Sequence, residues 1–145
     1  MYYMKDYWPG KIHASHEPYR VTEEEIIEVG RRWAPRPFHT DPATAANSGG
    51  VAACPAHLVC MVSWLAHHVD EDVAALSGLG WKNIKMYAPV RPGDEISLKC
   101  HCLEARPSGS RPDCGVVTCR NDLFNQKGKL VFSAEVSLLV MRRPE

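Results

Sequence analysis

The hydrophobic positions repeat with a helical period in the first half of the chain and with a period of two in the second. The longest apolar run, residues 55–69, reads P-A-H-L-V-C-M-V-S-W-L-A-H-H-V and holds no acidic residue, lysine or arginine. A helix that is apolar on every side is expected inside a protein, covered by other elements. The run is too short to span a membrane. It therefore predicts a long, buried central helix.

A first helix is predicted over residues 22–34. Thr22 is a suitable N-cap, and Glu25, three residues later, completes the pattern of a capping box. Three consecutive glutamates, residues 23–25, suit the positive end of the helix dipole. Pro35 ends the helix because proline cannot continue the backbone hydrogen bonding. A second, short helix over residues 43–47 is predicted to begin at Asp41, a cap followed by proline in the first turn.

Alternation of apolar and polar residues predicts an antiparallel meander in the second half. The turn R91-P-G-D94 places proline before glycine, as a type II turn requires. An edge strand interrupted by Pro18 is expected earlier, over residues 11–21. The predicted strands of the second half cover residues 81–90, 96–102, 116–119 and 130–141, separated by a polar loop at 106–113 and a turn at 125–128.

Helices in the first half and strands in the second predict an α+β fold, with one sheet packed against helices. A curved antiparallel sheet wrapped around a long apolar central helix is the hot-dog arrangement. We expect one such domain over residues 1–145. Exposed sheet edges invite pairing with another chain, so a homodimer or higher homo-oligomer is expected.

Composition excludes several classes of protein. The chain of 145 residues is 45% hydrophobic and 23% charged, which is globular rather than disordered. Lys plus Arg and Asp plus Glu balance at 17 each, so the basic surface of a nucleic-acid-binding protein is not expected. Neither a signal peptide nor a membrane span is recognisable in the sequence. We therefore expect a soluble, cytoplasmic protein without nucleic-acid or membrane partners.

The six cysteines include no Cys-x-x-Cys pair. Cys100 and Cys102 flank His101 on a predicted strand, where a metal site and two packed thiols beside an outward histidine are both conceivable. Packed thiols explain the pattern more simply. Cys54 precedes a helix start, where a thiol can be activated, but no surrounding His–Asp arrangement is recognisable and packing is favoured. We predict no metal and no cofactor.

The segment W33-A-P-R-P-F-H-T-D-P42 is predicted to be a rigid loop that aims a histidine. Pro35 and Pro37 restrict the backbone on one side of His39, and the helix capped by Asp41 restricts it on the other. Phe38 adds an aromatic contact beside the ring. An exposed connector would not need these costly residues, so His39 is the strongest candidate for a functional side chain.

Several blocks along the chain together resemble the MaoC-like dehydratases, hot-dog proteins that include the (R)-specific enoyl-CoA hydratases. The resemblance covers nearly the whole chain, and its most specific block is P-F-H-T-D-P. The blocks are Y7-W8, V21-T-E-E-E-I26, P35-R-P-F-H-T-D-P42, G49-G-V51, V90-R-P-G-D94 and the RPSGSRP run over residues 106–112.

The resemblance implies a catalytic histidine at His39, paired in the family with an aspartate five residues earlier. That position holds Ala34 here. The family also uses a glycine N–H at the start of the central helix to hold the thioester oxygen, and Pro55 stands there without an N–H. We expect the neighbouring backbone N–H groups of Ala56 and His57 to bind the substrate instead.

Two further side chains are assigned to substrate binding. Arg36 replaces the family's Asn or Gln, and we expect it to meet a substrate carboxylate or a CoA phosphate; a solvated loop arginine is the competing interpretation. Phe38 is assigned to the same site. For the side chain of His57, a place in the pocket and a hydrogen-bonded position in the core both stay open. Asp41 is a weaker candidate base because its helix cap uses its oxygens.

These residues imply a dehydratase or hydratase of fatty acid metabolism acting on an acyl thioester of enoyl-CoA or 3-hydroxyacyl-CoA type. If active it is a hydro-lyase, impaired or unorthodox because Ala34 and Pro55 replace catalytic groups. One alternative is a catalytically degenerate hot-dog subunit that binds an acyl-CoA or acyl-carrier thioester or pairs with an active homologue. A hot-dog thioesterase is the second alternative, disfavoured because residues 55–69 hold no carboxylate.

Overall fold

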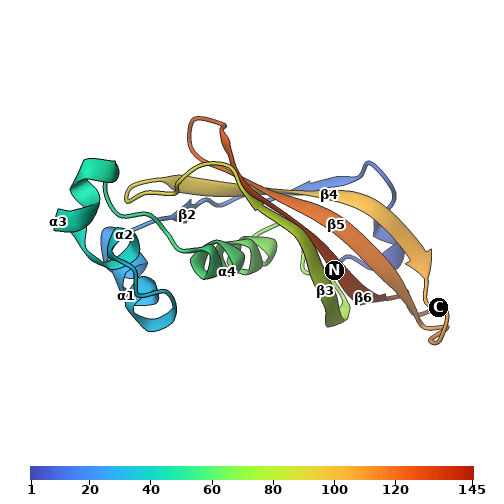
Figure 1. Ribbon diagram of the computed structural model, residues 1–145. Coiled ribbons are helices and arrows are strands. Elements are labelled where there is room, and N and C mark those ends of the chain that lie inside the picture. The colour runs from blue at the N-terminus through green and yellow to red at the C-terminus, as the bar shows by residue number, and fades with distance from the viewer.

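The computed structural model describes residues 1–145 (Figure 1). Short helices occupy the first part of the chain and four long strands the last part, as predicted. The helices are η1 (Met4–Asp6), α1 (Glu23–Trp33), α2 (Pro37–Thr40), α3 (Pro42–Ala45), η2 (Ala46–Ser48) and α4 (Pro55–Ala66). The strands are β1 (Ile12–Ala14), β2 (Tyr19–Arg20), β3 (Ala75–Met86), β4 (Glu95–Pro107), β5 (Cys114–Phe124) and β6 (Leu130–Met141).

All six strands form one antiparallel sheet in the order β1-β4-β5-β6-β3, and β2 also pairs with β4. The predicted edge strand over residues 11–21 is confirmed as two pieces, with Pro18 in the gap between β1 and β2. The turn from Arg91 to Asp94 is confirmed as well, since Gly93 has the positive φ of 87° that a type II turn demands at this position.

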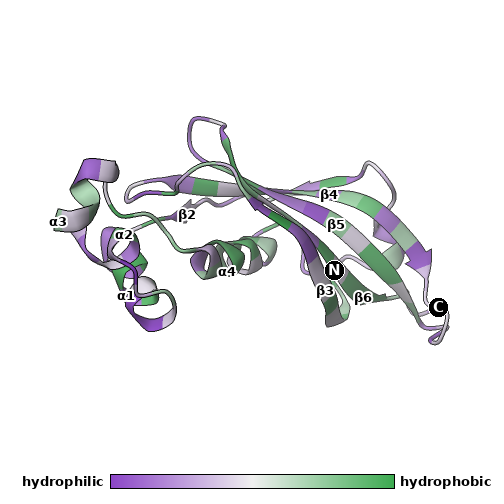
Figure 2. Ribbon diagram, viewed as in Figure 1, coloured by the Kyte–Doolittle hydropathy of each residue, from purple (hydrophilic) through white to green (hydrophobic).

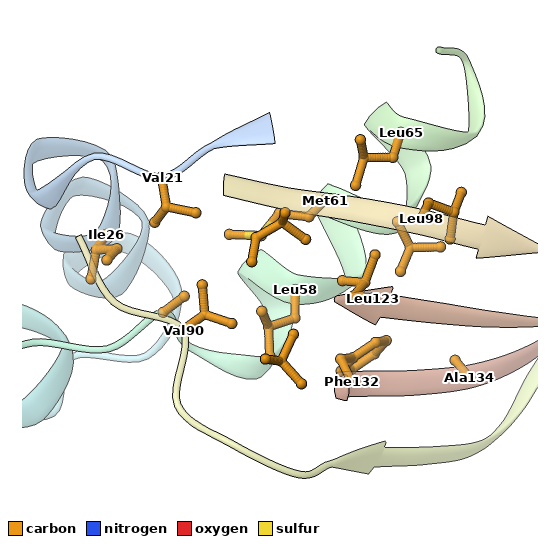
Figure 3. Packing of buried hydrophobic residues seen from close by; sticks show 14 of the residues in the cluster. Val21, Ile26, Leu58, Met61, Leu65, Val90, Leu98, Leu123, Phe132 and Ala134 are labelled. Atoms are coloured by element: carbon orange, nitrogen blue, oxygen red, sulfur yellow. The ribbon is translucent and has the colours of Figure 1, made fainter. Parts of the chain in front are cut away.

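The main core lies where α4 packs under one end of the curved sheet (Figure 1, Figure 3). Leu58, Met61 and Leu65 of α4 point toward Leu98, Leu123 and Phe132 of the strands. Figure 2 shows hydrophobic residues on α4 and alternating with hydrophilic ones along β4 and β5. The hot-dog arrangement of sheet and central helix is therefore confirmed.

The sequence-based description of α4 needs two corrections. The helix ends at Ala66, three residues before the predicted end at residue 69. It is also not enclosed on all sides, because Pro55, Ala56, Cys60, Ser63 and Trp64 are exposed. The polarity of the sequence could not reveal this. An apolar residue that the rest of the protomer covers cannot be distinguished, in the sequence, from an apolar residue that is left exposed. No helix of the chain is long and apolar enough to cross a membrane.

The first long strand, β3, was predicted too short. It spans Ala75–Met86 rather than residues 81–90, and its pairing with β6 passes through three register irregularities. Gly78 and Gly80 hid its first half, because glycine is unfavourable inside strands. Every residue of β3 is exposed. Strands β4 and β5 likewise extend beyond their predicted bounds, which narrows the predicted loop at 106–113.

Candidate active site

His39 lies on α2, a one-turn helix within the segment that was predicted to be a loop. Pro37 occupies the first helical position, where its missing N–H costs no hydrogen bond. The ring of Phe38 meets the His39 ring edge to face, with 4.5 Å between centroids. His39 is buried, at 8% exposure, so the segment holds it against the protein rather than in solvent.

The backbone before α4 determines which nitrogen of His39 carries a proton. Nδ1 lies 2.6 Å from the carbonyl oxygen of Ala52, which can only accept, so Nδ1 donates. The amide of Ala52 in turn donates to the carbonyl of Phe38 at 2.9 Å. Nε2 has no partner within the protein. It therefore presents a lone pair that can accept a proton from water or substrate.

Gly30 permits this placement, and the sequence analysis did not recognise its importance. It lies on the buried side of α1, and a methyl group there would come within 2.6 Å of the His39 carbonyl oxygen and 2.9 Å of its Cβ. The sequence did hold a signal, because glycine inside a helix lowers stability. Its presence suggests that another part of the backbone packs closely against that position. Gly30 is thus the contact surface on which α2 rests.

No carboxylate bonds to His39. Ala34, at the position of the expected aspartate, is the C-cap of α1. Asp41 caps α3, as predicted, by accepting from the amide of Ala43 and the hydroxyl of Thr44. The hydrogen bonds from Thr44 lower the pKa of Asp41, which makes it a still weaker base.

The start of α4 leaves the amide of Ala56 free. Cys54 is the N-cap and is fully buried, which agrees with packing rather than nucleophilic use. Pro55 follows at the first helical position. The His57 amide donates to the Cys54 carbonyl at 3.0 Å, whereas the Ala56 amide has no backbone acceptor. Of the two amides expected to bind substrate, Ala56 is the one left free.

The side chain of His57 is buried and bonds to two partly exposed polar side chains. At 2% exposure, its Nε2 lies 2.8 Å from Oε1 of Glu25 and 3.4 Å from the hydroxyl of Tyr19. This corrects the predicted capping box: Thr22 accepts from the Glu25 amide as expected, but the Glu25 carboxylate bonds to His57. The His57–Glu25 pair links α1 to α4.

The exposed face beside His39 carries aromatic and cationic side chains. Arg36 is exposed and takes part in no ion pair within the chain. Phe38 is 48% exposed and Trp33 66% exposed, with the Arg32 guanidinium over the Trp33 ring. Large exposed aromatic groups beside an unpaired cation are suited to bind a planar or anionic group.

Arg91 braces the loop that leads into α4. Its guanidinium donates to the carbonyls of Gly50 at 2.6 Å and Ser48 at 2.8 Å. Gly49 has a φ of 92°, and a methyl group there would press on that guanidinium. The V-R-P-G-D turn and the G-G-V block are therefore one structural unit that positions the entry of the central helix.

A cavity of about 330 Å³ opens further along α4, beside its second half. Its walls are mostly apolar, and Val62, Ser63 and Ala66 are the contributions of α4. His39 does not line it. The imidazole bonds to Ala52, which precedes the central helix, whereas this hollow space begins at Val62, about 10 Å beyond the start of the helix at a rise of roughly 1.5 Å per residue. No group of three or more His, Cys, Asp or Glu side chains is arranged to hold a metal ion.

Comparisons with known proteins cover the whole chain. A crystal structure of the MaoC-like dehydratase from Rhodospirillum rubrum is 31% identical, covers 100% of both chains and superposes with a TM-score of 0.90. The monoamine oxidase regulatory protein from Archaeoglobus fulgius is 25% identical over 99% of this chain and 96% of its own, with a TM-score of 0.81. The R-hydratase PhaJ1 from Pseudomonas aeruginosa shares the fold at 19% identity, 97% and 86% coverage and a TM-score of 0.78. No family model matches the sequence.

Proposed function

The chain belongs to the MaoC-like dehydratase family, and from that premise we propose that it binds an acyl thioester and acts as a slow hydro-lyase through His39. The observation that carries the proposal is the imidazole at the entry of the central helix, with Nδ1 held by Ala52 and Nε2 free. The substrate is an enoyl-CoA, a 3-hydroxyacyl-CoA, or the corresponding acyl-carrier thioester.

His39 supplies the acid–base chemistry. In hydration, the oxygen of a water molecule bonds to C3 of the enoyl group while Nε2 takes the proton that the water loses. The imidazolium then delivers a proton to C2, and dehydration runs the same steps in reverse. The family divides this work between two groups. Because Ala34 has no carboxylate, His39 works alone, and the loss of one acid–base group lowers the rate by about 10²–10⁴.

The thioester oxygen is held at the first turn of α4. Negative charge develops on this oxygen as C2 gains electron density, and a helix N-terminus stabilises it. Pro55 has no N–H, so the Ala56 amide is the donor. Removing one such donor typically costs about 10²–10³ in rate. The CoA moiety lies over the exposed face, where Arg36 meets a phosphate and Phe38 contacts the planar groups.

Crotonyl-CoA hydration tests this assignment. The unmodified protein is expected to be slow and His39→Ala slower still. Ala34→Asp together with Pro55→Gly should raise the rate by restoring both missing groups. A fast unmodified enzyme whose rate is untouched by His39→Ala would contradict the assigned site.

A second candidate function is that of a subunit that binds an acyl thioester without turnover. It is favoured because this chain has Ala34 and Pro55 where the family has catalytic groups. Thermal shift measurements with acyl-CoA and with free CoA distinguish the two. Stabilisation by acyl-CoA without hydration, even in the Ala34→Asp, Pro55→Gly variant, would establish the binding role.

We also infer that two copies pair through the edge of β3. One side of β3 pairs with β6 and the other has no partner in the protomer. This edge exposes Leu76, Leu79, Ile84 and Met86, an apolar strand edge that a monomer would need to protect. Ile84→Lys should shift the mass measured by light scattering from dimer to monomer. Ile12→Lys is the matched control, because Ile12 is an exposed residue of β1 at the opposite edge. Equal masses for both variants would reject this interface.

A further inference from the structure

Three of the six cysteines gather on one face of the sheet. Cys100 and Cys102 are alternate residues of β4, and they share the face that carries Leu98, a residue of the core under α4. Cys119 of β5 lies directly opposite Cys102. Cys102 and Cys119 belong to a second, smaller hydrophobic cluster, and Cys100 packs against it. All three are free thiols, and the acid–base chemistry assigned to His39 uses none of them.

The backbone hydrogen bonds show that Cys102 and Cys119 form a non-hydrogen-bonded pair of the β4–β5 ladder. The amide of Cys102 donates to the Lys11 carbonyl at 2.8 Å, and its carbonyl accepts from the Gly10 amide at 3.0 Å. Both groups therefore point away from β5. Residues opposite each other in such a pair have Cα atoms about 4.5 Å apart, within the range of about 4.4–6.8 Å that disulfides span. The two cysteines are positioned for a disulfide.

Cys100 brings a third thiol to the same partner. The pKa of Cys119 is raised, first by the thiol of Cys100 against which it lies and then by burial. Cys100 and Cys102 are poorly placed to bond with each other, because alternate residues of one strand have Cα atoms about 7 Å apart, at the limit of what a disulfide spans. Cys119 is thus the shared partner of the other two. The three thiols are not arranged to hold a metal ion.

The three thiols differ in how well an oxidant can reach them. Cys102 is 2% exposed and Cys119 is 6% exposed, whereas Cys100 is partly exposed and lines the cavity of about 330 Å³. Burial raises the pKa of Cys102 to about 11, so few of its thiols are ionised at neutral pH. Oxidation of a cysteine follows its exposure and its thiolate character. Cys100 is therefore the thiol at which a small oxidant enters the cluster.

We propose that these cysteines form a peroxide-reactive site, in which oxidation enters at Cys100 and ends as a disulfide between Cys102 and Cys119. The Cys100 thiolate attacks hydrogen peroxide, so that the O–O bond breaks, an S–O bond forms and hydroxide leaves. The thiol of Cys119 then attacks the sulfenic acid at Cys100, which forms their disulfide and releases water. Finally the Cys102 thiolate attacks the Cys119 sulfur, and Cys100 leaves as the thiolate. Two thiols are oxidised and one peroxide is reduced to two waters.

Peroxide treatment followed by peptide mapping tests the site. The reduced protein is treated with a slight molar excess of hydrogen peroxide, alkylated and digested, and tandem mass spectrometry locates each disulfide. We expect a bond between Cys102 and Cys119, while the buried Cys114 stays a free thiol. The urea midpoint should rise because the cross-link restricts the unfolded chain, and dithiothreitol should reverse both changes.

Three variants follow the oxidation step by step. Cys100→Ser should slow the formation of the disulfide by roughly tenfold or more, since peroxide must then react with a buried thiol. Cys102→Ser should stop the sequence at the Cys100–Cys119 disulfide. Cys60→Ser removes an exposed cysteine outside the cluster, so it is the matched control and should form the Cys102–Cys119 disulfide as the wild type does.

Three results would overturn the proposal. In the first, Cys102 and Cys119 stay reduced while the exposed Cys60 is oxidised. In the second, Cys100 proceeds to the sulfinic acid and no disulfide forms. In the third, Cys100→Ser forms the disulfide at the wild-type rate, so that Cys100 is not the point of entry. Mapping of the wild type tests the disulfide itself even if a variant does not fold.

Discussion

Replacing Gly30 with alanine should destabilise this protein, although the same change in an ordinary helix interior stabilises it. Alanine is favoured over glycine within a helix by about 1 kcal/mol. Here the new methyl group would lie 2.6 Å from the His39 carbonyl oxygen and 2.9 Å from its Cβ. Both atoms are fixed to the backbone of α2, so they cannot rotate away and the whole turn must shift.

The size of the effect follows from the difference of two quantities. Overpacking a tight contact costs about 1–3 kcal/mol. Set against the helix preference of about 1 kcal/mol, this leaves a net loss of unfolding free energy of up to about 2 kcal/mol. The shift of α2 also lengthens the 2.6 Å bond from His39 Nδ1 to the Ala52 carbonyl. The tautomer of His39 is then no longer fixed.

Urea denaturation measures the first effect, and the nitrogen NMR signals of the His39 ring measure the second. Gly109→Ala is the matched control, since Gly109 has no positive φ and open space where the methyl group would lie. That variant should match the wild type in both measurements. An increase of about 1 kcal/mol in the stability of Gly30→Ala, with the His39 signals unchanged, would refute the reasoning, because the helix preference alone would then act.

Two further predictions concern buried histidines. Glu25→Ala leaves the buried His57, which is 2% exposed, without its carboxylate partner. The unfolding free energy measured in urea titrations should fall by about 1–3 kcal/mol. Glu24→Ala is the control and should have little effect, because Glu24 lies one residue away and is unpaired. The pKa of His13 is lowered by burial and then by Lys11, against Asp6 and Asp70, so the unfolded chain binds a proton there more readily than the folded one. The contribution of His13 to the unfolding free energy is complete at a pH above the pKa of about 6.5 that the residue has in the unfolded chain. This contribution is lost as the pH falls toward the lower pKa that the residue has in the folded protein. His13→Phe should flatten that part of the pH–stability curve, and an unchanged slope would contradict it.

Local features of the site were determined by the sequence. The Thr22 cap, the Asp41 cap and the glycine of the turn at residues 91–94 depend on neighbours a few residues away, and all three were predicted and found. The chemistry of two further positions was also determined locally, because Ala34 has no carboxylate and Pro55 no N–H in any fold. The family resemblance rested on such short blocks and was confirmed.

Contacts between distant segments were decided only by the tertiary structure. Glu25 had a plausible local partner, and only the packing of α1 on α4 assigned its carboxylate to His57. Gly30 looked like any helical residue until α2 came to rest on it. His13 attracted no attention in the sequence because a lone histidine on a short strand has no pattern. Whether a buried polar atom has a partner depends on every chain segment that surrounds it, and no spacing along one segment can express that.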